Sequence, residues 1–221
     1  IFDEFLIKYK KNYNNKTEFK ILRSKVVLNT PTRVSLKIDF EGKWDIVPLI
    51  ISLDKHSACL KFMFDWINTQ KNHLLTAGFE LVSPIREVFS EDMNQLIKRN
   101  FEPEYDIRKN LPKTRGIEAK TNTAPMQRGL LIDEEENNLG VVTKGLTQYE
   151  VAKNRLYIPI LRATGVISNP QNPARSTPAG PPIEVETLQM IGNNKAEFYV
   201  FFGNQNAFVD TLNQVYNYII V

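Results

Sequence analysis

The chain has 221 residues, of which 42% are hydrophobic and 24% charged, so it can bury a sizeable core in one large or two small domains. Its 28 Lys and Arg against 25 Asp and Glu leave a net charge of +3, which gives no reason to expect nucleic acid as a partner. No apolar run approaches the ~20 residues that a membrane-spanning helix needs, so we expect no membrane partner.

The N-terminal third of the chain predicts β-strands. Residues 19–28 are apolar and β-branched with basic residues interleaved, and residues 34–40 alternate strictly with period two. A further strand is predicted over 44–53, and the strongest candidate spans 60–66. The predicted core face of that strand carries Leu60, Phe62, Phe64 and Trp66.

The middle of the chain is less regular. Residues 74–81 predict a short apolar strand, and residues 91–99 predict a brief helix. The segment from 103 to 125 is predicted to be mostly irregular, because its prolines cannot donate to a sheet ladder.

From residue 127 onward the pattern predicts hairpins. Residues 129–132 and 140–143 form two apolar runs around an acidic turn at 133–138, and a turn is predicted at Lys144-Gly145. Residues 148–151 and 156–160 predict the next strand pair.

The last third combines a stiff loop, a hairpin and a helix. The proline-rich stretch 169–182 predicts a stiff loop, and residues 184–190 and 196–202 predict two strands around a turn at 192–194. An apolar stripe then predicts a short C-terminal helix capped by Asn206, although 218–221 would equally suit a strand. The stripe consists of Phe208, Leu212, Val215, Tyr216 and Ile219.

This pattern predicts an all-β fold, a large β-sandwich (super-sandwich) of mostly antiparallel strands with a short C-terminal helix. The many short strands separated by turn signals are typical of one or two stacked sandwiches. We assign residues 1–221 to one such region.

The residues offer little catalytic chemistry. His56 and His73 have no second ligand at a suitable spacing, so no metal site is predicted in this chain. Cys59, the single cysteine, is expected to be a buried inert thiol. Because one cysteine cannot form an internal disulfide, a reducing, cytoplasmic location is favoured. The acidic run 133–136 is expected to be a solvated turn, because a working carboxylate pair needs one desolvated member. We therefore predict no catalytic residue.

Aromatic side chains could stack on a sugar. Tyr149 and Tyr157 are the candidates, with hydrogen-bonded strand residues as the alternative interpretation. Trp44 is a further candidate, whereas Trp66 is expected in the core.

Several motifs resemble the C-terminal β region of α-mannosidases of glycoside hydrolase family 38. The most specific are residues 139–151 (LGVVTKGLTQYEV) and 161–168 (LRATGVIS), preceded by 62–66 (FMFDW). The stretch 177–182 (TPAGPP) is shorter than the corresponding family loop, which leaves the subfamily and the mannosidic linkage open.

The resemblance implies that this chain is the non-catalytic part of a longer enzyme. It implies that an N-terminal catalytic domain, absent here, binds zinc and hydrolyses terminal α-mannosides with retention. The β region would pack on that domain and help to wall the pocket for a mannose-containing glycan. Arg155 corresponds to an arginine that approaches the ligand in some relatives. It is therefore a predicted substrate contact, together with Tyr149, which is predicted from its aromatic ring. An ion pair of Arg155 with a carboxylate is the alternative.

Two other functions remain open at this point. The chain could be a free-standing carbohydrate-binding β-sandwich, which would carry a polar groove lined by aromatic residues. It could also be a structural interaction domain. A non-catalytic region of a mannosidase predicts instead an exposed apolar patch.

Overall fold

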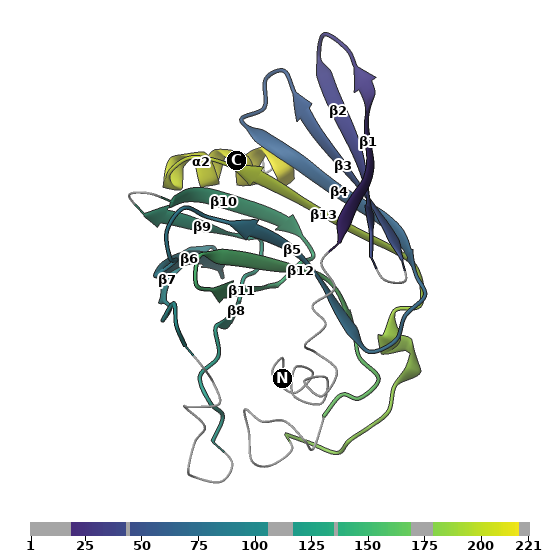
Figure 1. Cartoon of the computed structure of the whole chain (residues 1–221). Helices are drawn as coiled ribbons and strands as arrows, with labels where there is room; N and C mark the ends of the chain where they lie inside the picture. Colours follow the sequence, from purple (N-terminus) through teal and green to yellow (C-terminus); the bar gives the residue numbers. More distant parts are fainter. Residues whose placement is uncertain (1–18, 43–44, 106–116, 135–136, 169–178, 217–221) are drawn as a thin grey trace.

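Thirteen strands form two antiparallel sheets in a computed structural model that describes residues 19–42, 45–105, 117–134, 137–168 and 179–216 (Figure 1). The larger sheet has the order β1-β2-β3-β4-β13-β10-β9-β6-β7. Its strands are β1 (Lys20–Asn29), β2 (Arg33–Glu41), β3 (Ile46–Asp54), β4 (Cys59–Asn68), β6 (Glu87–Asp92), β7 (Gln95–Asn100), β9 (Gly129–Glu134), β10 (Asn137–Lys144) and β13 (Gly192–Phe201). The smaller sheet has the order β5-β12-β11-β8, with β5 (His73–Glu80), β8 (Thr123–Pro125), β11 (Gln148–Ala152) and β12 (Arg155–Ala163). The predicted all-β sandwich is confirmed.

The main core lies between the two sheets. Phe198 of β13 is fully buried and stacks on Phe62 of β4 at a centroid distance of 5.1 Å. Phe79 of β5 meets Phe198 edge-on from the smaller sheet, at 6.0 Å. The predicted core face of β4 is confirmed, since Phe64 and Trp66 are 6% and 4% exposed and Phe62 packs against the same cluster.

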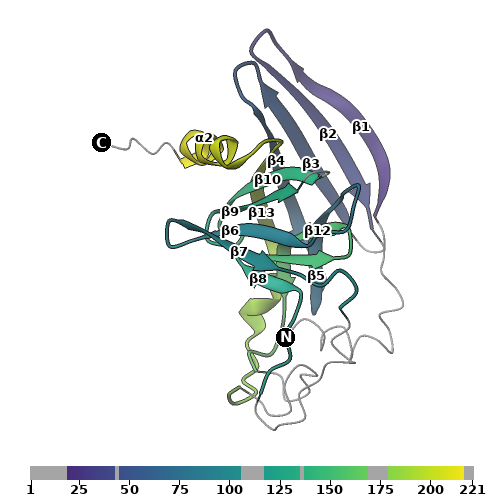
Figure 2. The same cartoon turned by 90° about the vertical axis from the view of Figure 1, so that its left-hand side faces the viewer.

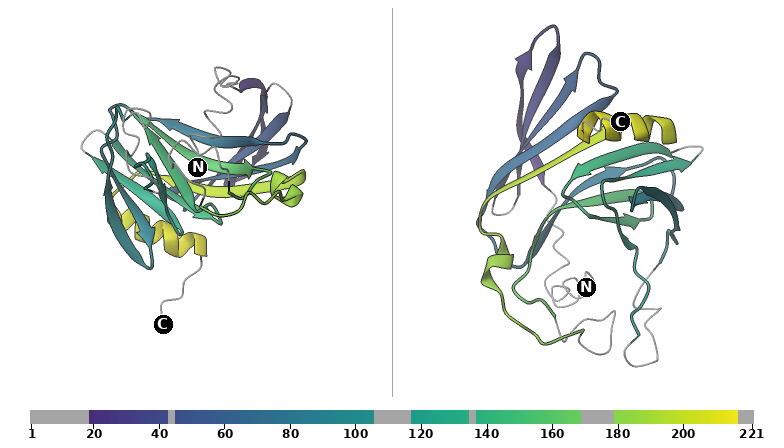
Figure 3. Two further views of the ribbon diagram at one scale, coloured as in Figure 1. Left: turned by 90° about the horizontal axis from the view of Figure 1, so that it is seen from below. Right: turned by 180° about the vertical axis from the view of Figure 1, so that it is seen from behind.

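A second core lies on the other face of the larger sheet. Helix α2 (Gln205–Tyr216) covers β9, β10 and β13 there (Figure 3). Its apolar stripe is confirmed within the described residues, and Ile219 lies outside them. The buried members of the stripe are Phe208, Leu212 and Val215. Strands β9 and β10 are therefore buried on both faces, which explains their unbroken apolar runs.

The cap of α2 lies two residues before the predicted one. The side-chain oxygen of Asn204 accepts hydrogen bonds from the backbone N–H groups of Asn206 and Ala207, at 3.0 and 3.4 Å. Asn204 is therefore the N-cap, and Asn206 lies in the first turn. Tail residues 218–221, for which a strand was equally open, lie outside the described residues.

The helix predicted over 91–99 is wrong. This segment is a hairpin of β6 and β7 whose two turn residues, Met93 and Asn94, have φ values of 50° and 62°. Two residues of positive φ are typical of a type I′ turn. The buried carboxylate of Glu91 holds the turn, because it accepts hydrogen bonds from the Asn94 N–H and the Arg128 guanidinium.

Two predictions before the last strand are also wrong. Residues 186–189 form a 3₁₀ helix instead of a strand, and Gly192–Asn194 begin β13 opposite β4 instead of forming a turn. The Asn68 side chain fixes this connection, since its amide donates to the carbonyls of Gln189 and Met190 at 3.1 and 3.0 Å. The turn at Gly145 is confirmed by its φ of +78°. The proline-rich loop lies mostly outside the described residues.

Strands β1, β2 and β3, here called the wing, extend beyond the smaller sheet (Figures 1 and 2). All ten residues of β1 are exposed. No helix of the described residues is long and apolar enough to cross a membrane.

Candidate functional site: a polar rim beside the smaller sheet

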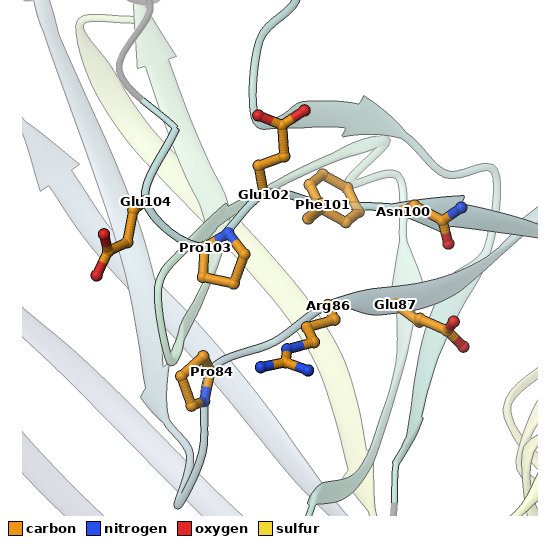
Figure 4. A pocket seen from close by; sticks show the side chains of 8 residues that line it. All are labelled: Pro84, Arg86, Glu87, Asn100, Phe101, Glu102, Pro103 and Glu104. Carbon is orange, nitrogen blue, oxygen red and sulfur yellow. The ribbon is translucent and has the colours of Figure 1, made fainter.

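An open pocket of about 720 Å³ lies at the open end of the β6–β7 hairpin, where β6 begins and β7 ends (Figure 4). Two neighbouring segments border it, the connection from β5 into β6 and the turn that follows β7. Its lining residues are Pro84, Arg86, Glu87, Asn100, Phe101, Glu102, Pro103 and Glu104.

Backbone hydrogen bonds fix the two segments that border the pocket. The N–H of Phe101 donates to the carbonyl of Arg86 at 2.7 Å. One carboxylate oxygen of Glu134 accepts the N–H groups of Arg86 and Glu87 at 2.7 and 2.8 Å. Glu134 belongs to the acidic turn that the sequence predicts as solvated, so part of that turn has a structural role. Residues 135 and 136 lie outside the described part.

The pocket presents both hydrogen-bond donors and acceptors. Arg86 is exposed and makes no ion pair with a described residue. Glu102 pairs with Lys120 at 3.0 Å and keeps 65% of its side chain exposed. A carboxylate this accessible to water lacks the desolvation that a general acid needs. The polar edge of the pocket, here called the rim (Arg86, Asn100 and Glu102), therefore carries the donors and acceptors that ligand hydroxyls require, and its geometry gives no support for bond cleavage.

Arg155 lies at the start of β12, directly opposite Glu80 of β5. Its Nη2 donates to Glu80 Oε2 at 3.0 Å, and 45% of its side chain is exposed. Hydrogen bonds with Tyr157 and Glu80 raise the pKa of Arg155 above its ordinary value. In the structure Arg155 therefore forms an ion pair with a carboxylate, which was the alternative interpretation of this residue.

The segment that carries Arg86 packs against the turn that precedes Arg155. The β5–β6 connection follows the turn between β11 and β12, because the Ile85 N–H donates to the Lys153 carbonyl and the Leu81 N–H donates to the Asn154 carbonyl, both at 2.8 Å. The Asn154 side chain also donates to the carbonyl of Leu81 at 2.9 Å. One connection therefore carries Arg86 on its pocket side and lies against the turn that precedes Arg155.

Tyr149 lies in the core instead of on the rim. It is 0% exposed, and its ring meets Phe101 at 5.9 Å in an edge-on contact. Burial raises the pKa of Tyr149 to about 12, and Ser90 and Arg99 offset only part of that effect. A fully buried ring has no face for a sugar, so the geometry favours a packing role that supports the pocket from behind.

The other aromatic and metal-ligand candidates are scattered. Tyr157 is half-buried, Trp66 belongs to the core as expected, and Trp44 lies outside the described residues. Burial lowers the pKa of His73, and His56 is exposed on a turn. No three His, Cys, Asp or Glu side chains gather into a metal site in the part of the chain that the structure describes.

The sequence did not reveal the pocket. Glu102-Pro103-Glu104 offers no catalytic spacing, and the helix expected over 91–99 hid the hairpin that brings this segment beside Arg86. A hairpin prediction for Met93-Asn94 would have placed the two segments together, but only the Asn is a typical residue of positive φ.

Comparison with solved structures identifies the fold. Two chains from Enterococcus faecalis match, one described as a protein in glycosyl hydrolase family 38 and the other as an alpha-mannosidase. Each match has a TM-score of 0.63 at 15% sequence identity and covers 91% of this chain. This chain therefore shares the fold of part of these two proteins.

This resemblance in fold agrees with the one carried by the sequence motifs. The present chain spans only about a quarter of the matched structures, 25% and 24% of their lengths. No family model matches the sequence, and no curated protein matches it.

Proposed function

We propose that this chain is the C-terminal, non-catalytic β-sandwich of a longer α-mannosidase. The observation that carries the proposal is the match in fold over 91% of the chain to structures about four times as long. The hydrolysis of terminal α-mannosides, with retention, would then take place on a catalytic domain outside these residues. Zinc, which the resemblance in the sequence motifs implies for the parent enzyme, would bind there as well.

In this proposal the polar rim faces the sugar pocket of the parent enzyme. Arg155 would donate to hydroxyls of a mannose-containing glycan, while Glu80 fixes the direction of its guanidinium. A cross-strand pair at the end of a sheet suits this role because the backbone sets the position of both side chains.

Activity assays of the complete gene product and of the 221-residue chain test the proposal. Only the complete gene product should hydrolyse an aryl α-mannoside. Within it, Arg155→Ala should lower kcat/KM about tenfold, the loss of roughly one hydrogen bond to substrate. Arg33→Ala is the matched control, because Arg33 forms an equally exposed cross-strand pair with Asp54, on the wing. Turnover by the 221-residue chain alone, or a complete gene product without mannosidase activity, would contradict the proposal.

The pocket supports a second candidate, a carbohydrate-binding module that acts without a catalytic partner. Arg86, Asn100 and Glu102 offer the mixture of donors and acceptors that sugar hydroxyls require. Calorimetry of the 221-residue chain with mannose oligosaccharides separates the candidates. Binding that Arg86→Ala abolishes would favour the module, and the absence of binding would favour the mannosidase region.

A further inference from the structure

One face of the wing is apolar and uncovered. Four of its side chains remain between 45% and 64% exposed. Four more on the same face are half-buried. The eight residues, here called the wing face, are Ile21, Val26, Val34 and Leu53, with Leu36, Ile38, Phe40 and Ile51.

Strand register shows that the wing face continues the main core. Residues directly opposite each other in an antiparallel pair point to the same side of a sheet. Val26 lies opposite Leu36 and Leu36 opposite Ile51, which in turn lies opposite Phe62. Phe62 lies opposite the fully buried Phe198. The same sheet face is therefore covered by the smaller sheet at one end and exposed at the other.

The opposite face of the wing carries ion pairs and a hydrogen bond between its own side chains, beside the exposed Leu28 and Ile46. Arg33 pairs with Asp54 at 2.5 Å. Ser35 and Ser52 share a hydrogen bond of 2.8 Å. Asp39, whose side chain is 4% exposed, pairs with Arg23 at 2.5 Å and with Lys37 at 3.3 Å. A sheet face that is apolar throughout, as the wing face is, normally packs on another layer.

We infer that the wing face is the surface on which the catalytic domain of the parent polypeptide packs. This inference rests on the proposed function, and the occupant follows from the length of the matched structures. About three quarters of each matched chain has no counterpart here, so a second layer would be supplied by the same polypeptide. Packing of that layer would extend the sandwich core outward to β1, and the partner surface must be apolar opposite Val26, Val34 and Leu53.

Carbene footprinting of the complete gene product and of the 221-residue chain tests the inference. Labelling of Ile21, Val26, Val34 and Leu53 should fall at least fivefold in the complete gene product. Leu28 and Ile46 are matched controls, because they are 40% and 48% exposed but lie opposite Ser35 and Glu41 on the other face. Their labelling should change less than twofold.

A double variant tests whether packing of the catalytic domain depends on the apolar side chains of the wing face. Val26→Asp with Val34→Asp should restore labelling of Leu53 in the complete gene product to the level of the 221-residue chain. Leu28→Asp should leave the low labelling of Leu53 unchanged.

Three outcomes would overturn the inference. Equal labelling of the wing face in both proteins would show that no domain covers it. Low labelling already in the 221-residue chain, lost when residues 1–18 are deleted, would assign the face to its own N-terminal segment. Labelling that falls with concentration, together with a dimer in sedimentation, would assign it to a second copy. Mannosidase activity with equal labelling would leave the proposed function standing and remove only the docking surface.

Discussion

A single methyl group at position 140 would collide with an aromatic ring across the strand pair. Gly140 lies opposite Phe201, and a Cβ at this position would lie 1.8 Å from the Phe201 Cζ. The ring cannot move away freely, since it also packs against Phe208 of α2 at 6.1 Å. The missing side chain of Gly140 therefore leaves room for the Phe201 ring, which packs between β10 and helix α2.

We expect Gly140→Ala to destabilise the chain by roughly 2–3 kcal/mol, because the ring must leave its packed position. Urea unfolding measures the change, and Gly180→Ala serves as the control because a methyl group there would have no other atom within 4 Å. In a Phe201→Ala background the cost of the alanine should largely vanish. An equal cost in both backgrounds would contradict the collision.

Glu197 is the centre of a charged cluster on the helix side of the larger sheet. Burial opposes its charge, but hydrogen bonds from Lys61, Tyr199 and Lys144 outweigh that effect and lower the pKa of Glu197 to about 2. Its Lys61 and Tyr199 partners lie at 2.8 and 2.7 Å. A carboxylate with a depressed pKa in the folded state stabilises the protein above its unfolded pKa and loses that contribution as the pH falls.

The stability that Glu197 contributes should therefore be present at pH 7 and disappear as the pH falls from about 4.5 towards 2. Glu197→Gln should cost about 2 kcal/mol at pH 7 and much less at pH 3, as measured by urea unfolding at both values. Asp65→Asn is the control, because its pair with Lys195 is more than half exposed and should contribute little. A cost for Glu197→Gln that does not change with pH would contradict this account.

At the scale of elements, helix α2 depends on one side chain outside its bounds. Asn204 satisfies two N–H groups of the first turn, whereas Asn206 lies exposed within that turn. The sequence favoured Asn206 because it lies two residues before the apolar stripe begins at Phe208.

Replacement of Asn204 by Ala should cost about 1 kcal/mol, the usual contribution of such a cap. Asn206→Ala should change the stability by less than about 0.5 kcal/mol, because an exposed position in the first turn tolerates Ala. Thermal unfolding of both variants measures the difference. A larger effect at position 206 than at position 204 would show that Asn206 is the N-cap, as the sequence predicted.

Some elements could be predicted from the sequence because their signal is local. Strict alternation in β2 and the aromatic face of β4 specify strands whatever lies around them. The β6–β7 hairpin could not be predicted, because Met93 has no intrinsic preference for positive φ and the buried Glu91–Arg128 contact holds the turn from 37 residues away. The 3₁₀ helix before β13 depends in the same way on Asn68, which lies more than 120 residues earlier.

At the scale of the whole molecule, aromatic side chains at the centre of the main core connect the two sheets. Phe198 contacts Phe62, Phe64 and Phe79, and Phe79 belongs to the other sheet. The sequence predicted the aromatic face of β4, but it could not show which residue meets the second sheet, because that contact joins β5 to β13 across more than 100 residues. For the same reason it missed the pocket, which depends on how the β5–β6 connection lies beside the turn after β7.

Phe198→Ala should destabilise the chain by roughly 3–5 kcal/mol, because it leaves a cavity at the contact between the sheets. Phe202→Ala, directly after the end of β13 and 72% exposed, should change the stability by less than about 0.5 kcal/mol. Denaturant titrations followed by circular dichroism compare the two. Equal effects would show that the aromatic contact does not hold the sheets together.

The outer edge of β1 has consequences for how the chain behaves in concentrated solution. Within the described residues β1 has a strand on one side only. The backbone N–H and C=O groups on its other side are free of a partner strand there and are available for pairing with a second molecule. Lys20, Arg23 and Lys25 line this strand, and mutual repulsion between like charges opposes such pairing. Salt weakens that repulsion over the ~10 Å Debye length at 0.1 M ionic strength, so aggregation of the chain should become faster as ionic strength rises.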